Sequence, residues 1–382
     1  MIPGVPIFIP ARLKQAREAR GLTMISLAEL LDISKQAISQ YENGSSSPRP
    51  EILERIASIL KLPVEFFFRP VSDESHRKIF YRSMSSATKT ARTRGERRYS
   101  WIREIVSFLS ELVELPTVQF PTWKFPANPI QISDEDIQRA AQETRKFWGL
   151  GDGPISNVVW LLENKGAVVS RTMLAAETLD AFSEWDSVED RPYFVLGADK
   201  GAAARSRFDA AHELGHVILH RQIDKLSLSR PADFRLIEQQ AHSFAGYFLL
   251  PPSSFVNDFY VPSLDTLRAL KSKWNVSIGM MMMHIARLGL ISEDTGLRLW
   301  RSYARRGWKL KEPLDGDTPV EKPRMLKQAF ELIIDKQILS REAVLSTLPL
   351  NATDIEELAG LPQGYLTGEQ AESNLLLFTR KR

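Results

Sequence analysis

The sequence predicts a mainly helical chain with a small β-sheet, an α+β protein divided into several domains. Short apolar-periodic segments separated by turn residues fill residues 11–68, and a longer helical pattern carries His212-Glu-Leu-Gly-His216. Three short runs rich in β-branched and aromatic residues precede that helix, as expected for strands. At about 100 to 200 residues per domain, 382 residues suggest two or three domains.

The first domain is expected to be an all-α bundle over residues 11–68. Its helices are predicted at 12–20, 23–31, 34–42 and 51–60. Connections as short as Asp32-Ile33 and Asn43-Gly44 pack neighbouring helices against one another, and Ser34 is expected to cap the third helix. The residues expected in the core are Ala28, Ile33, Ile38, Ile52, Ile56 and Leu60.

Residues 27–44, Leu-Ala-Glu-Leu-Leu-Asp-Ile-Ser-Lys-Gln-Ala-Ile-Ser-Gln-Tyr-Glu-Asn-Gly, resemble the helix-turn-helix of Xre-type and phage repressors. The resemblance implies that the helix from Ser34 enters the major groove of DNA. Such modules often place glutamine where this chain has Met24. The side chains implied to face base edges or the DNA backbone are Lys35, Gln36, Ser39, Gln40 and Asn43. The alternative is a module that docks only proteins.

Basic residues are concentrated just after this domain. Nine of them lie between Arg77 and Arg103, against Glu96 alone, although the net charge of the whole chain is only +3. The segment predicts either a surface that steers nucleic acid or a solvated linker helix. Residues 69–153 are assigned to this basic linker and a helical scaffold. The scaffold includes an amphipathic helix at 99–113 and a capped helix at 133–148.

Short strands are expected at 167–171, 181–185 and 193–196. The last of them, within Arg191–Gly197, immediately precedes the histidine-bearing helix. An edge strand in this place could pair with an extended substrate through main-chain hydrogen bonds.

His212, Glu213 and His216 are the most informative residues. Residues four apart share one face of a helix, so the two imidazoles converge on one ion and Glu213 projects beside them. With six histidines in 382 residues, a chance His-Glu-x-x-His is improbable. The chain has no cysteine, so a metal must be held by histidine and carboxylate. Catalytic zinc takes three protein ligands, so a third donor is needed.

The best third donor is Glu238, at the start of a helix expected over 236–250 and stopped by Pro251. Its packing face is expected to comprise Ala241, Phe244, Ala245 and Phe248. If this face packs on the His-Glu-Leu-Gly-His helix at Gly215, Glu238 can reach the ion.

The chain resembles the ImmA/IrrE zinc endopeptidases over roughly residues 154–290. The motifs that carry the resemblance are His-Glu-Leu-Gly-His-x-x-x-His, then Glu-x-x-Ala-x-x-Phe-Ala, and then Leu-Leu-Pro. The resemblance implies a zincin-like peptidase domain in which His212, His216 and Glu238 hold Zn²⁺ and Glu213 is the general base. Some members of that family cut Xre-type repressors.

Two further histidines accompany the motif. Family members often carry asparagine at the position of His242, which here could be a fourth ligand, a proton donor, or a helix residue hydrogen-bonded elsewhere. His220 lies one turn beyond His216, where it could orient a ligand or simply end a helix.

The peptidase domain is assigned to residues 154–312, including a helix-turn-helix-like pair at 264–274 and 277–288, and 313–382 to a helical C-terminal region. Met280 to Met283 are expected to serve as adaptable packing. Helices are expected at 323–336, 340–348 and 353–358, with no catalytic cluster among them.

Together these features predict a DNA-binding transcriptional regulator fused to a zinc endopeptidase that cleaves a regulatory protein such as an Xre-type repressor. The alternative is a regulator or antitoxin-like protein whose metal-binding domain senses a ligand or mediates interaction without proteolysis. No run of 18 apolar residues exists, and Met1–Pro10 does not resemble a signal peptide. A cytoplasmic protein without a membrane partner is expected, and a homodimer is compatible with the sequence.

Overall fold

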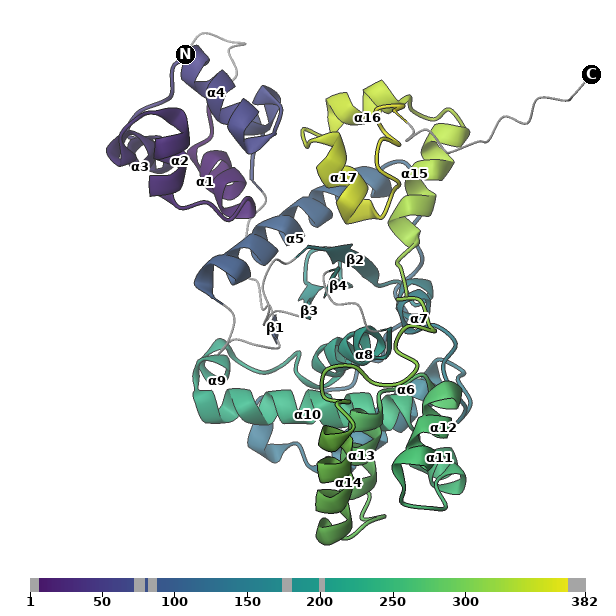
Figure 1. Cartoon of the computed structure of the whole chain (residues 1–382). Helices are drawn as coiled ribbons and strands as arrows, with labels where there is room; N and C mark the ends of the chain where they lie inside the picture. Colours follow the sequence, from purple (N-terminus) through teal and green to yellow (C-terminus); the bar gives the residue numbers. More distant parts are fainter. Residues whose placement is uncertain (1–6, 72–79, 82–87, 174–180, 199–202, 370–382) are drawn as a thin grey trace, which may run out of the picture.

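A computed structural model describes residues 7–71, 80–81, 88–173, 181–198 and 203–369 (Figure 1). In these residues helices predominate, and one four-stranded mixed sheet lies at the centre of the molecule. The predicted α+β class is confirmed. The N-terminal bundle and the C-terminal helices lie on one side of the sheet, and the helix with the histidine motif lies on the other (Figure 1).

The N-terminal bundle follows the predicted pattern. It contains α1 (Pro10–Ala19), α2 (Met24–Leu31), α3 (Lys35–Asn43), α4 (Pro50–Leu60) and the short 3₁₀ helix η1 (Val64–Phe68). Thr23 and Ser34 cap α2 and α3 through their hydroxyls. Gly44 ends α3 with a φ of 79°, a left-handed conformation that glycine adopts without steric cost. Of the expected core, Ala28, Ile38, Ile56 and Leu60 are buried, and Ile33 and Ile52 pack at its border.

Helix α5 (Lys89–Ser110) contains most of the basic segment, and three of its half-buried arginines form ion pairs with other parts of the fold. Arg97 pairs with Glu18 of the bundle at 2.8 Å, Arg98 with Glu357 near the C-terminus at 2.5 Å, and Arg103 with Asp186 of the sheet at 2.5 Å. For these three arginines both earlier interpretations, a nucleic-acid surface and a solvated linker, are wrong, because each guanidinium is already paired within the fold. Arg77, Lys78 and Arg82 lie outside the described residues.

The sheet has the order β1-β3-β4-β2. Its strands are β1 (Phe80–Tyr81), β2 (Val168–Thr172), β3 (Ala181–Asp186) and β4 (Arg191–Gly197). β4 pairs with β3 in antiparallel and with β2 in parallel orientation. The expectation that β4 offers a free edge to a substrate is therefore wrong, because both of its edges already carry main-chain hydrogen bonds.

The sheet separates two hydrophobic clusters, since alternate residues of a strand face opposite sides. Val168, Phe182, Tyr193 and Val195 contribute to the cluster shared by the N-terminal bundle, α5 and the C-terminal helices. Val169, Ala181, Phe194 and Leu196 contribute to the cluster around the histidine motif.

The second cluster is built mainly from helices that follow the sheet. They are α8 (Ala203–Leu219), α9 (Lys225–Ser229), α10 (Pro231–Leu249), α11 (Pro252–Asp258), α12 (Leu264–Trp274), α13 (Ile278–Arg287) and α14 (Glu293–Arg305). Two helices before β2, α6 (Asp134–Phe147) and α7 (Val158–Asn164), and the 3₁₀ helix η2 (Pro129–Gln131) complete it. A capping box between Ser133 and Asp136 begins α6, as predicted.

Three helices form the C-terminal region, α15 (Met325–Asp335), α16 (Arg341–Thr347) and α17 (Ala352–Ala359). α15 and α17 pack against α5 and β2, and Asp354 pairs with Arg20 of α1 at 2.6 Å. This region therefore shares one hydrophobic core with the N-terminal bundle.

Candidate metal centre and helix-turn-helix surface

Helix α8 carries the His-Glu-Leu-Gly-His motif through the interior of its domain. Arg205 is the only residue of this helix that is exposed. A helix buried on nearly every side lies between other elements, and α8 lies between β3 and β4 on one side and α10 on the other. The side chains of His212, Glu213 and His216 are fully buried, so their polar atoms require partners within the protein.

His212, His216 and Glu238 converge on one point. The two Nε2 atoms are 3.1 Å apart, and the Glu238 carboxylate lies 3.4 Å from His212 Nε2 and 3.3 Å from His216 Nε2. Zinc bonds of 2.0 to 2.2 Å in tetrahedral geometry place neighbouring ligand atoms about 3.3 to 3.5 Å apart. The three donors therefore fit a zinc ion in both chemistry and spacing.

A glycine makes this convergence possible. A Cβ added at Gly215 would lie 3.1 Å from Ala241 Cα and 3.2 Å from Phe244 Cβ, closer than ordinary packing allows. α8 and α10 can therefore approach closely enough to bring Glu238 beside the two histidines. This close approach, expected from the small residues, is present in the structure.

Glu213 is held by the sheet. Ser183 Oγ, on β3, donates a hydrogen bond of 2.7 Å to Glu213 Oε2. The carboxylate thus has a fixed orientation beside the metal ligands, and His212, Glu213 and His216 form one cluster of potential donors.

His220 belongs to a buried hydrogen-bond relay behind His216. Gln240 donates from Nε2 to the carbonyls of Pro129 and Ile132, at 2.7 and 3.1 Å, so its Oε1 accepts from His220 Nε2 at 3.1 Å. His220 Nδ1 then accepts from His216 Nδ1 at 3.0 Å. This arrangement leaves His216 Nε2 unprotonated and directed at the candidate metal position.

The electrostatic surroundings of His220 favour the neutral ring that the relay requires. Complete burial lowers the pKa of His220 well below its usual value, and repulsion from His216 lowers it further. The hydrogen bond to Gln240 acts in the opposite direction but is the smallest effect.

His242 lies on the open side of the same cluster. Its Nδ1 is 3.0 Å from the backbone oxygen of Glu238, and its ring is 4.5 Å from the ring of His212 in an edge-on arrangement. His242 also belongs to a donor set with His212 and Glu238. Because the backbone carbonyl accepts from Nδ1, Nε2 is the atom through which His242 would act as a metal ligand.

The predicted DNA-contacting residues share the outer face of α3. Lys35, Gln36, Gln40 and Asn43 are exposed and Ser39 is half-buried. Asn43 Oδ1 also accepts the backbone N–H of Ser45 at 2.9 Å. This surface lies in the N-terminal bundle, on the other side of the sheet from α8 (Figure 1).

Sequence reasoning missed Ser183 and Gln240. Gln240 could have been suspected, because it is a polar residue on the buried face of α10 beside Ile237 and Ala241. Nothing in the local sequence distinguishes Ser183 from any other serine in a strand.

Fold and site together define a helix-turn-helix protein with a second, peptidase-like domain. Residues 13–67 match a family profile described as helix-turn-helix. Residues 162–285, which contain the whole donor set, match the IrrE N-terminal-like domain, a peptidase family. The predicted fusion of an Xre-type helix-turn-helix with an ImmA/IrrE-family domain is therefore confirmed.

Curated relatives match short stretches of the chain. The HTH-type transcriptional regulator SutR of Escherichia coli (strain K12) is 38% identical over 63 residues, which are 16% of this chain and 35% of that protein. An uncharacterized HTH-type transcriptional regulator of Sinorhizobium medicae (strain WSM419) is 34% identical over 64 residues, 17% of this chain and 46% of the relative. The uncharacterized regulator RghRB of Bacillus subtilis (strain 168) is 40% identical over 55 residues, 14% of this chain and 40% of the relative. Each alignment thus spans less than half of the relative.

In the described part of the chain, no helix combines the length and apolar character needed to cross a membrane.

Proposed function

We propose that this chain is a DNA-binding transcriptional regulator with a zinc-dependent endopeptidase domain, and that its substrate is a regulatory protein such as an Xre-type repressor. The convergence of His212, His216 and Glu238 to within 3.4 Å is the observation that supports the peptidase half. A set of two histidines and one glutamate is a protein ligand set of catalytic rather than structural zinc.

Zinc held by these donors would lower the pKa of a bound water toward 7 and polarise the scissile carbonyl. Glu213 accepts the proton of the attacking water and passes it to the leaving nitrogen. Ser183 keeps the Glu213 carboxylate oriented for this transfer. The relay through His220 keeps the Nε2 lone pair of His216 available. His242 would be the alternative donor of the proton to the leaving nitrogen only as an imidazolium, because its Nδ1–H is directed at the Glu238 carbonyl and a neutral ring then carries no proton on Nε2.

The DNA-binding half rests on the exposed outer face of α3. In helix-turn-helix proteins the corresponding helix enters the major groove, and its side chains here are polar or basic. Curated relatives that match 63 and 64 residues of this chain are described as HTH-type transcriptional regulators.

The peptidase proposal is tested by metal analysis and peptide cleavage with the full chain. Protein purified without chelator should carry about one zinc per chain, because His212, His216 and Glu238 together form a complete ligand set, and His212→Ala should lose it. Glu213→Gln should keep both zinc and fold yet lose cleavage of the Xre-type repressor encoded nearest to this chain, or of a degenerate peptide library if that repressor is resistant.

Full zinc occupancy in His212→Ala would show that the ligands lie elsewhere. Zinc-loaded wild-type protein that cleaves neither substrate would favour the alternative, in which the metal-binding domain senses a ligand or mediates interaction. Activity of Glu213→Gln within a few-fold of wild type would refute the general-base role.

A further inference from the structure

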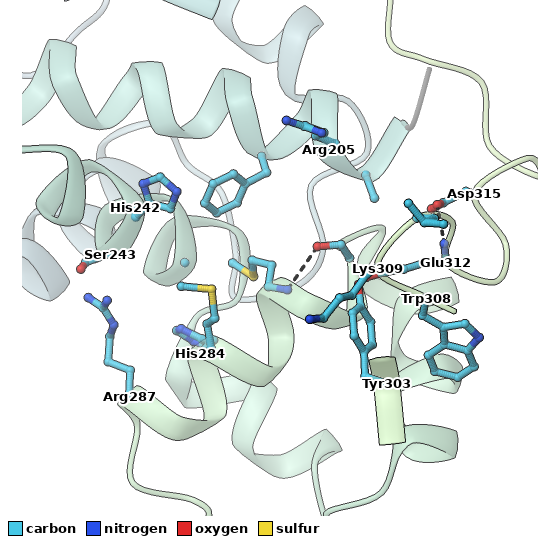
Figure 2. A pocket seen from close by; sticks show the side chains of 17 residues that line it. Arg205, His242, Ser243, His284, Arg287, Tyr303, Trp308, Lys309, Glu312 and Asp315 are labelled. Carbon is cyan, nitrogen blue, oxygen red and sulfur yellow. Dashed lines mark hydrogen bonds between the residues drawn. The ribbon is translucent and has the colours of Figure 1, made fainter. Parts of the chain in front are cut away.

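A cavity of about 310 Å³ opens beside the candidate metal centre (Figure 2). His242 lines it and lies against His212, with ring centroids 4.5 Å apart. Phe208 also lines it, and its ring is 5.2 Å from that of His242. The cavity and the donor set thus share the Phe208 and His242 side chains as a common wall.

The interior of the cavity is suited to an apolar side chain. Phe208, Met280 and Met283 line it, and Gly246 leaves room on α10. A Cβ added at Gly246 would lie 3.1 Å from His284 Nδ1, so larger residues there would push into the cavity wall. Methionine side chains adapt to apolar groups of different shapes.

The two acidic residues of the cavity, Glu312 and Asp315, share one cation. Lys271 pairs with Glu312 at 2.7 Å and with Asp315 at 2.5 Å. Glu312 also accepts the backbone N–H groups of Ile278 and Gly279 and the hydroxyl of Tyr303. These two carboxylates therefore hold α13 and the segment after α14 in place. Together with Lys271 they leave one uncompensated negative charge, which is outnumbered by the basic residues that line the same cavity.

Three basic residues, Arg205, Arg287 and Lys309, line the cavity. Arg205 and Lys309 are exposed at the cavity, and no ion pair of Lys309 occurs among the described residues. Arg287 also lines it and pairs with Asp134 at the surface. Burial lowers the pKa of His284 to about 4, so this ring is uncharged at neutral pH. Figure 2 shows His242 and Ser243 on one side of the cavity and Tyr303, Trp308 and Lys309 on the other.

We infer that this cavity is the specificity pocket of the proposed peptidase, which takes a large apolar side chain of the substrate and attracts an acidic residue close to it. The inference rests on the proposed function. An extended peptide advances about 3.3 Å per residue, so a pocket that shares a wall with the metal centre accepts a residue within about two positions of the cut. Met280 and Met283 then select the apolar side chain, and Arg205 and Lys309 select the acidic neighbour.

The test uses the zinc-loaded full chain and a degenerate dodecapeptide library, with cleavage sites identified by mass spectrometry. Leucine, methionine or phenylalanine should be enriched about tenfold over alanine at one position near the cut, the range that a hydrophobic pocket provides. Aspartate or glutamate should be enriched within two positions of it.

Two variants assign these preferences to the cavity. Met283→Trp should remove the preference for large apolar residues, and the double variant Arg205→Glu with Lys309→Glu should replace the acidic preference with a basic one. The matched controls are Leu332→Trp, also at a half-exposed apolar position on a helix, and Lys146→Glu, at an exposed position on α6. Both should retain the wild-type profile. Unchanged profiles in the pocket variants would overturn the inference while leaving peptidase activity established.

If the wild-type chain cleaves nothing, the same library is passed over immobilised, zinc-loaded Glu213→Gln protein. Peptides that contain apolar and acidic residues should be retained, and the added substitution Met283→Trp should abolish this retention. That result would support the pocket and refute the proposed hydrolysis. No selective retention would overturn the pocket. Binding of 2-naphthoate, a small aromatic anion, without any peptide selectivity would also overturn it, because the cavity would then serve a small molecule.

Discussion

Ser183 Oγ donates a hydrogen bond of 2.7 Å to Glu213 Oε2, so a strand on one side of α8 fixes the carboxylate that lies beside the candidate zinc ligands. Both residues are fully buried. The orientation of the proposed general base is thus determined by the packing of α8 on β3, and not by the helix alone.

Ser183→Ala should keep zinc and fold but lower kcat about tenfold to a hundredfold, because a hydrogen bond to a charged group is worth about 1.5 to 3 kcal/mol. KM should change little, since Ser183 does not reach the substrate. Steady-state kinetics on one library-derived peptide would measure the effect. Ser170→Ala is the matched control, because Ser170 is also a buried strand serine but donates to the carbonyl of Leu358. Equal kcat in the two variants would contradict the positioning role.

His220→Phe should weaken zinc binding about 10- to 100-fold, the usual effect of losing a partner behind a metal ligand. Phenylalanine preserves a ring but cannot accept the proton of His216 Nδ1. Competition with a metal-indicator dye would give the affinity. His284→Phe is the matched control and should retain wild-type zinc affinity. His284 is also buried, but among the described hydrogen bonds its partner is the Leu250 carbonyl. Unaltered affinity in His220→Phe would rule out the relay.

His242→Asn distinguishes the three roles open to this residue. We expect zinc to be retained and kcat to fall about a hundredfold, because loss of a proton-transfer group commonly costs 10²- to 10⁴-fold. Metal analysis and steady-state kinetics on the same preparation would separate the cases. Loss of zinc would identify His242 as a fourth ligand, and unchanged zinc and kcat would identify it as a helix residue that is hydrogen-bonded elsewhere.

Substitutions on α3 test the DNA-binding half. Gln36→Ala should cost about 1 to 3 kcal/mol at an operator selected from random DNA and relax its sequence preference. Lys35→Ala should weaken binding to all sequences and reduce the salt slope by about one if it contacts a phosphate. Fluorescence anisotropy at several salt concentrations would measure both, with Lys327→Ala on α15 as the control. Absence of sequence-selective binding by the wild-type chain would indicate a module that docks proteins.

Glu163 gives the folded state a pH dependence. Burial raises its pKa to about 7, although the N–H groups of Arg324 and Met325 at the start of α15 act against the shift. Between about pH 4.5 and 7, Glu163 is therefore protonated in the folded chain but ionised in the unfolded chain. Its contribution to the free energy of unfolding falls as the pH rises through this range, by at most about 1.4 kcal/mol per pH unit. Above pH 7 it is constant.

Glu163→Gln should remove this dependence, since the amide oxygen can still accept both N–H groups. The difference in unfolding free energy between variant and wild type, measured by urea denaturation, should shift in favour of the variant from pH 5 to pH 7.5. A difference that is independent of pH would contradict the raised pKa of Glu163.

Much of the fold could be predicted because it is encoded locally. Helix periodicity, capping residues such as Thr23 and Ser34, and turn residues such as Gly44 determine elements from interactions within a few residues. The same holds for His212, Glu213 and His216, which share one helix and therefore one face.

Only the tertiary structure decided which distant residues meet. The distances from Glu238 to the histidines depend on how closely α10 approaches Gly215, and the contacts of Ser183 and Gln240 depend on the packing of β3 and of the segment around Pro129 against the same helices. The central place of β4 and the ion pairs of Arg97, Arg98 and Arg103 likewise arise between segments far apart in the chain. A sequence pattern reports which face of an element is apolar, but the partner of that face is selected by the packing of the whole chain.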